Sequence, residues 1–158
     1  MAFLCFCLVS SCGYLLNDVL DRQKDALHPR KKYRPIAAGK ISPQFAVTVA
    51  LLFFLIGIFA SYTINMALGL ILLIYFVQTA AYSLILKRLV IIDVIIIALG
   101  FMFRAIAGVL VIEEPISSWL IICTIFLSLF LALNKRFAEV TAMGDKAKVV
   151  RKTLAQYN

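Results

Sequence analysis

The sequence predicts an all-α fold: a polytopic transmembrane helix bundle of about five spans, formed by residues 1–158 as a single domain. Of the 158 residues, 63% are hydrophobic and only 15% are charged, whereas a soluble domain carries about 25% charged residues. Residues 41–86 contain no charged side chain, and a single membrane-spanning helix needs only about 20 apolar residues. This composition excludes a water-soluble globular protein, and also a disordered chain, which would be poor in apolar residues.

The five expected spans lie, in chain order, at about residues 2–20, 43–62, 66–86, 91–112 and 115–134. The first is short and contains polar residues, and the long uncharged run divides into the second and third at the polar residues 61–65. A signal peptide is the competing interpretation of the first span. Signal sequences begin with a positive region, and no basic residue precedes Arg22, so a curtailed helix that ends near Asn17 and Asp18 fits better.

The distribution of positive charge predicts the orientation in the membrane. Three segments expected on one side, 21–42, 87–90 and 135–158, hold seven, two and six of the sixteen Lys and Arg residues. Of the two segments between them, 63–65 is uncharged and 113–114 is acidic. By the positive-inside rule the basic side is cytoplasmic. We therefore expect a multi-pass protein of the cell (inner) membrane whose basic face meets anionic lipid headgroups, with no nucleic acid partner despite the net charge of +8.

The acidic residues that follow the first span predict a metal site. If the first helix continues to Asp25, then Asp18, Asp21 and Asp25 lie on one helical face, with Asn17 one turn below Asp21. Carboxylates on one face repel each other unless a cation lies between them, and Mg²⁺ takes oxygen ligands that it shares with substrate phosphates. The alternative is a solvated acidic helix end, which the helix dipole disfavours because it places anions at a C-terminus.

A basic segment follows these carboxylates and predicts a phosphorylated substrate, a diphosphate in particular. Its cations are Arg30, Lys31, Lys32, Arg34 and Lys40. His28 precedes Pro29, so its backbone should be extended. Contact with substrate and a structural role at the bend of the loop both remain open for His28.

Two long motifs resemble the first Asp-rich region of the UbiA-type intramembrane prenyltransferase superfamily: Asn17-Asp18-x-x-Asp21-x-x-x-Asp25 and His28-Pro29-x-Lys31-x-x-Arg34-Pro35-Ile36-Ala37-x-Gly39-x-Ile41-Ser42. Further segments resemble the decaprenyl-phosphate phosphoribosyltransferase branch of that superfamily: Tyr82-Ser83-Leu84-x-Leu86-Lys87-Arg88, Gly100-Phe101-x-x-Arg104, and Leu131-Ala132-Leu133-x-Lys135-Arg136-x-x-Glu139. The resemblance covers nearly the whole chain. It implies part of a nine-helix fold, so we expect a fragment or a truncated gene product.

One departure from the superfamily pattern bears on the substrates. Members that attach a prenyl group to an aromatic acceptor have a second Asp-rich motif, where this chain has the basic pair Lys135 and Arg136. The resemblance therefore implies a Mg²⁺-dependent membrane transferase that moves phosphoribose from phosphoribosyl pyrophosphate to a polyprenyl (decaprenyl) phosphate in cell-wall biosynthesis. A prenyltransferase that uses a prenyl diphosphate and a small acceptor, and a truncated non-catalytic membrane protein, are the alternatives. A homo-oligomer also remains open.

The resemblance and the charge pattern together assign roles to individual residues. The expected Mg²⁺ ligands are Asn17, Asp18, Asp21 and Asp25, and the residues expected to act in catalysis are Asp18, Asp21, Lys31 and Arg34. The residues expected to bind substrate are Asn17, Lys31, Arg34, Tyr82, Lys87, Arg104, Lys135, Arg136 and Glu139. Tyr82 and Lys87 can serve one site only if the helix ends between them.

Two ionisable residues lie inside the fourth span. Arg104 follows Asp93 by eleven residues, which is about 16 Å along a helix and places it near mid-membrane. A charge there is costly unless it is paired or hydrated, so Arg104 should face a cavity, where it contacts a phosphate or a carboxylate of another helix. Asp93 lies at the cytoplasmic rim and is either a further ligand of the cavity or one half of an interhelical ion pair.

Overall fold

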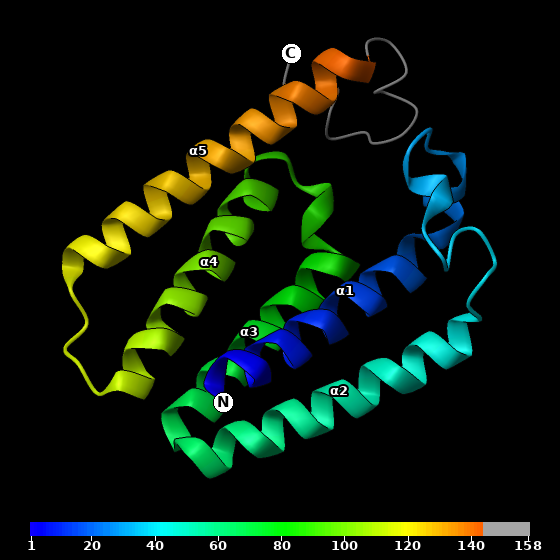
Figure 1. Ribbon diagram of the computed structural model, residues 1–158. Coiled ribbons are helices and arrows are strands. Elements are labelled where there is room, and N and C mark those ends of the chain that lie inside the picture. The colour runs from blue at the N-terminus through cyan, green and yellow to red at the C-terminus, as the bar shows by residue number, and fades with distance from the viewer. Residues whose placement is uncertain (144–158) are drawn as a thin grey trace.

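The computed structural model describes residues 1–143, apart from the side chains of residues 88, 90 and 139–143. Within this range the fold is all-helical, as predicted, with five helices long and apolar enough to cross a membrane (Figure 1). The helices are α1 (Ala2–Leu27), α2 (Pro43–Ile64), α3 (Met66–Leu84), α4 (Val90–Ile112) and α5 (Ser118–Met143). Two short 3-10 turns, η1 (Lys31–Tyr33) and η2 (Leu86–Arg88), lie in the connections α1–α2 and α3–α4.

The helix boundaries follow from local residue chemistry. The Ser42 hydroxyl accepts a hydrogen bond from the Phe45 N–H at the start of α2, and Pro43 occupies the first turn, where its missing N–H costs nothing. Asn65 separates α2 from α3: its backbone is extended, and its side-chain oxygen accepts from the N–H groups of Ala67 and Leu68. The polar break in the long apolar run is thus a helix cap.

The helices form an open arrangement in which α1 lies between α2 and α3, α4 packs beside α3, and α5 packs against α4 (Figure 1). Gly57 allows the close approach of α1 and α2, since a Cβ there would lie 2.9 Å from the Val9 Cγ2 atom. The largest buried side chains of the core, including Val9, Leu68 and Leu72, come from α1 and α3. Large apolar side chains elsewhere point outward, as expected of surfaces that face lipid.

Two helices extend beyond the expected spans. Helix α1 is not curtailed, since it continues to Leu27 and carries the whole acidic motif. Helix α5 begins at Ser118 and continues through Lys135 to Met143, so the start of the expected cytoplasmic tail is helical, whereas its residues 144–158 lie outside the described part of the chain. One end of the bundle therefore brings together the C-terminal ends of α1, α3 and α5, the N-terminal end of α4, and both 3-10 turns (Figure 1).

Candidate functional site

The acidic motif forms one face of the last three turns of α1. Because the helix continues to Leu27, Asp18, Asp21 and Asp25 are spaced for a common face, as the sequence predicts. The loop that follows folds back on this face. The buried His28 stabilises the bend, because its Nδ1 atom accepts hydrogen bonds from the N–H groups of Arg30 and Lys31. These contacts give His28 a structural role, and its extended backbone agrees with the prediction.

Arg34 lies between two of the carboxylates. Its Nη1 atom is 2.6 Å from Asp18 Oδ1 and 2.9 Å from Asp25 Oδ2. Arg34 and Asp18 are partly exposed, whereas the Asp25 side chain is only 8% exposed. Lys31 lies near enough to Asp18 for electrostatic attraction. Arg34 and Lys31, two of the cations expected to bind phosphate, therefore lie at the acidic face itself.

A third cation reaches the same face from the connection between α3 and α4. Lys87 Nζ lies 2.6 Å from Asp21 Oδ2 and 3.2 Å from Asn17 Oδ1. Helix α3 ends at Leu84 and η2 follows, so the helix does end between Tyr82 and Lys87. A small cavity of about 130 Å³ opens beside this contact, and its lining residues are Leu20, Asp21, Lys24, Ser83, Leu84 and Lys87.

The oxygen donors of this face suit Mg²⁺ chemically, because three carboxylates and one amide oxygen are hard ligands. Among the described residues, however, no three His, Cys, Asp or Glu side chains are gathered as ligands of a single metal ion. The Arg34 guanidinium and the Lys87 ammonium instead each bridge two of the oxygen donors. A metal ion at this face would compete with these two cations for the carboxylates.

The basic pair on α5 is divided between two environments. Lys135 is exposed, whereas Arg136 is only 6% exposed and its Nε atom lies 3.0 Å from Oδ2 of the fully buried Asp93. Asp93 is thus one half of an ion pair between α4 and α5, the second of the two roles left open. Arg136 Nη2 also lies 3.5 Å from the Tyr82 hydroxyl. The side chain of Glu139 lies outside the part of the chain that the structure describes.

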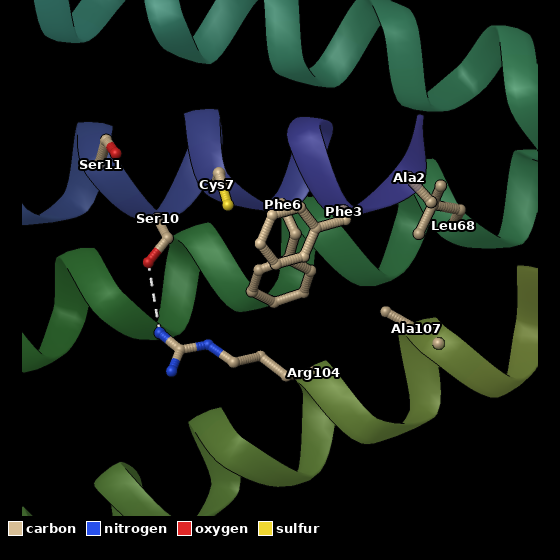
Figure 2. Close-up of a pocket in the computed structure, with 10 residues that line it drawn as sticks. Ala2, Phe3, Phe6, Cys7, Ser10, Ser11, Leu68, Arg104 and Ala107 are labelled. Atoms are coloured by element: carbon tan, nitrogen blue, oxygen red, sulfur yellow. Dashed lines mark hydrogen bonds between the residues drawn. The ribbon is translucent and has the colours of Figure 1, made fainter.

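Arg104 faces a second and larger cavity, deeper in the bundle (Figure 2). Its Nη2 atom donates to the Tyr75 hydroxyl at 2.9 Å and to Ser10 Oγ at 3.2 Å, and no carboxylate of the described residues contacts it. The cavity has a volume of about 490 Å³ and its lining residues are Ala2, Phe3, Phe6, Cys7, Ser10, Ser11, Leu68, Arg104, Ala107 and Gly108.

Sequence reasoning did not find the partners of Arg104. Ser10 is a polar residue within an apolar span, and that position could have suggested a buried donor or acceptor. Tyr75 gives no such signal, because a tyrosine in a spanning helix is equally compatible with packing. The contact joins α1, α3 and α4, and it depends on a tertiary arrangement that no local pattern encodes.

Comparison with known proteins places this geometry in context. The model of the UbiA prenyltransferase family matches residues 1–157. The chain is 36% identical over 99% of its length to a decaprenyl-phosphate phosphoribosyltransferase of Mycolicibacterium smegmatis, and 35% identical over 99% to that of Corynebacterium glutamicum. A more distant relative, 29% identical over 86% of the chain, is a protoheme IX farnesyltransferase of Leptospira biflexa. The chain covers 49%, 48% and 52% of these three relatives, so it spans about half their length.

Proposed function

The chain belongs to the UbiA prenyltransferase family, and from this membership we propose that it binds phosphoribosyl pyrophosphate and transfers 5-phosphoribose to a polyprenyl phosphate, releasing diphosphate. The observation that carries the proposal is the acidic face of α1 with Arg34 and Lys87 bound to it. Carboxylates and cations in one place suit a metal-bound diphosphate. The relatives from Mycolicibacterium smegmatis and Corynebacterium glutamicum are both named decaprenyl-phosphate phosphoribosyltransferase, and each matches 99% of this chain.

The donor diphosphate would bind at the cytoplasmic end of α1. Asn17, Asp18, Asp21 and Asp25 would hold Mg²⁺, whose charge would neutralise the diphosphate as it leaves. Arg34 and Lys87 would then exchange their carboxylate partners for diphosphate oxygens, with Lys31 beside them. Cations that engage the leaving group as negative charge develops stabilise the transition state more than the bound substrate.

The transfer itself would need no covalent enzyme intermediate. The bond between ribose C1 and the diphosphate oxygen breaks, C1 develops oxocarbenium character, and an oxygen of the lipid phosphate forms the new bond to C1. The acceptor phosphate is already an anion, so no general base has to remove a proton. Lys135 and Arg136 would lie on the acceptor side, where a cationic pair suits a bare phosphate.

Membranes that carry the protein provide the test. They would be incubated with Mg²⁺, labelled phosphoribosyl pyrophosphate and a polyprenyl phosphate, and the organic phase would be assayed for label. We expect label in the lipid fraction, lost on addition of EDTA and in Asp21→Ala, and retained in Glu114→Gln, an exposed acidic residue at the other end of the bundle. Because the chain spans about half of its relatives, the assay should include a longer form where its coding frame continues.

Prenyl transfer is the second candidate, and the similarity to a farnesyltransferase supports it. The same membranes would then transfer a prenyl group from its diphosphate to a small acceptor, and would leave phosphoribosyl pyrophosphate unused. Failure of both transfers in every available form would favour a non-catalytic membrane protein that binds metal or lipid only.

A further inference from the structure

We infer that Asp93 is a positioning residue for the acceptor side of the site: it fixes the direction of Arg136 and the rotation of α5, and thereby the place of Lys135. The inference rests on the proposed function, because it gives the basic pair of α5 a phosphate to bind. Asp93 is fully buried near the start of α4, and its Oδ2 atom lies 3.0 Å from Arg136 Nε.

The buried residues of α5 show what this ion pair controls. Ser128, Ala132 and Arg136 are the buried positions of this helix among the described side chains, and they recur every four residues. They form a single narrow stripe, which faces α4, the helix against which α5 packs. Arg136 is the cytoplasmic end of that stripe, and Lys135 is exposed beside it.

The other two members of the stripe cannot set the rotation of α5 precisely. Ser128 and Ala132 are small, and the Ser128 hydroxyl donates to the Thr124 carbonyl of its own helix. Small residues allow close approach of two helices in a membrane but make few directional contacts. The ion pair of Asp93 and Arg136 can set the rotation, because a rotation of α5 that separated the two groups would leave the carboxylate of Asp93 buried without this neighbouring charge.

Arg136 also connects α5 to the donor side of the site. Its Nε atom forms an ion pair with Asp93, and its Nη2 atom lies 3.5 Å from the Tyr82 hydroxyl on α3. The next residue, Ser83, lines the small cavity that Asp21 and Lys87 also line. The cytoplasmic ends of α3, α4 and α5 therefore meet at Arg136, next to the cavity beside the acidic face of α1.

A purely structural role explains this pair less well. Buried ion pairs commonly stabilise a protein no better than apolar side chains of the same volume, and their best-attested use is to fix the register of packed helices. An α5 held by apolar contacts alone would be as firmly attached but less closely oriented. Orientation matters here because Lys135 and Arg136 differ by about 100° around the helix, so a rotation of α5 changes the direction of both cations relative to the site.

The experiment compares binding of the two substrates in four variants: Asp93→Asn, Asp93→Glu, the exchange Asp93→Arg with Arg136→Asp, and the control Glu114→Gln. Thermal unfolding in detergent would be followed through the fluorescence of Trp119, the only tryptophan, with a short-chain polyprenyl phosphate or with phosphoribosyl pyrophosphate and Mg²⁺. Asp93→Asn should weaken the binding of polyprenyl phosphate about tenfold or more, and should weaken the binding of phosphoribosyl pyrophosphate by less than about twofold. Asp93→Glu should recover part of the loss, and the control should change neither affinity.

The exchanged pair separates positioning from stability. It should recover most of the unfolding temperature lost in Asp93→Asn, but not the affinity for polyprenyl phosphate, because the cation then projects from α4. The inference would be overturned if the exchanged pair recovered both the unfolding temperature and the affinity for polyprenyl phosphate. It would also be overturned if Asp93→Asn lost affinity equally for both substrates. The unchanged protein is the reference for the proposed function itself: if it does not bind polyprenyl phosphate, the proposed acceptor is wrong.

Discussion

Arg34 and Lys87 each bridge two oxygen atoms on an acidic helix face whose charges would otherwise repel one another. In the protein without substrate they serve the purpose that a metal ion would serve, at the same oxygen atoms. Free Mg²⁺ would have to compete with both cations, whereas a metal bound to a diphosphate would offer them new anionic partners. On this basis metal and diphosphate should bind together more tightly than either alone.

The first prediction follows from this competition. Removing one internal cation, as in Arg34→Gln or Lys87→Gln, should raise the affinity for Mn²⁺ in the absence of substrate by about tenfold, because one positive charge no longer competes. Electron paramagnetic resonance of free and bound Mn²⁺ would measure it in detergent. Lys40→Gln, an exposed cation of the same loop, is the matched control. Equal Mn²⁺ affinity in all variants would contradict the proposed competition between these cations and the metal ion.

The second prediction contrasts Arg104, which is partly buried, with Arg136, which is buried. Arg104 has hydroxyl partners, and Ser10 and Tyr75 remain 3.2 Å apart and able to bond each other without it, so Arg104→Met should change the free energy of unfolding by no more than about 1 kcal/mol. Arg136→Met leaves the carboxylate of Asp93 buried and should cost about 3–5 kcal/mol. Chemical unfolding in mixed micelles would measure both. A larger loss for Arg104→Met than for Arg136→Met would refute this assignment of the charges.

At the scale of elements, helix packing depends on which glycines lie at an interface. A Cβ at Gly57 would lie 2.9 Å from Val9 Cγ2 and 3.2 Å from the Cys5 carbonyl oxygen, whereas a Cβ at Gly108 would have no neighbour within 4 Å. Gly57 therefore lies at a close contact between α1 and α2, while Gly108 opens on the cavity shown in Figure 2.

The third prediction uses these two glycines as a pair. Gly57→Leu should destabilise the protein by about 1–3 kcal/mol, because α1 and α2 must separate to admit the side chain. Gly108→Leu should leave stability nearly unchanged, and should reduce the volume of the cavity that Arg104 faces. Unfolding temperatures of the two variants in the same detergent would test the contrast. Similar losses at both positions would show that the interface between α1 and α2 is not the limiting contact.

The sequence was sufficient to predict the elements but only half of the site. Hydropathy and the polar break at residues 61–65 locate five helices, and the spacing of Asp18, Asp21 and Asp25 predicts their common face. The partners of that face could not be predicted, because Arg34 reaches it through a loop shaped by His28, and Lys87 through the end of α3. The extent of α1 was also underestimated, since polar residues at a helix end suit helix and loop equally.

At the scale of the whole molecule, charge and fold agree on one functional end. The acidic face of α1, both 3-10 turns and the basic pair of α5 all lie at the same end of the bundle. Fifteen of the sixteen Lys and Arg residues lie in the segments predicted to be cytoplasmic. The short connections at the opposite end hold the acidic residues Glu113 and Glu114. The proposed substrate site and the predicted cytoplasmic side are therefore the same surface.

The fourth prediction tests this orientation directly. Single cysteines would be placed at Lys40 and Glu114, which are both exposed and lie at opposite ends of the bundle, in a protein whose four native cysteines are replaced by alanine. In intact cells, a maleimide that cannot cross the membrane should label the cysteine at position 114 and not that at position 40, because basic loops remain in the cytoplasm. Permeabilised cells should show labelling at both positions. Labelling at position 40 in intact cells would place the acidic face of α1 outside the cell, where cytoplasmic phosphoribosyl pyrophosphate could not reach it.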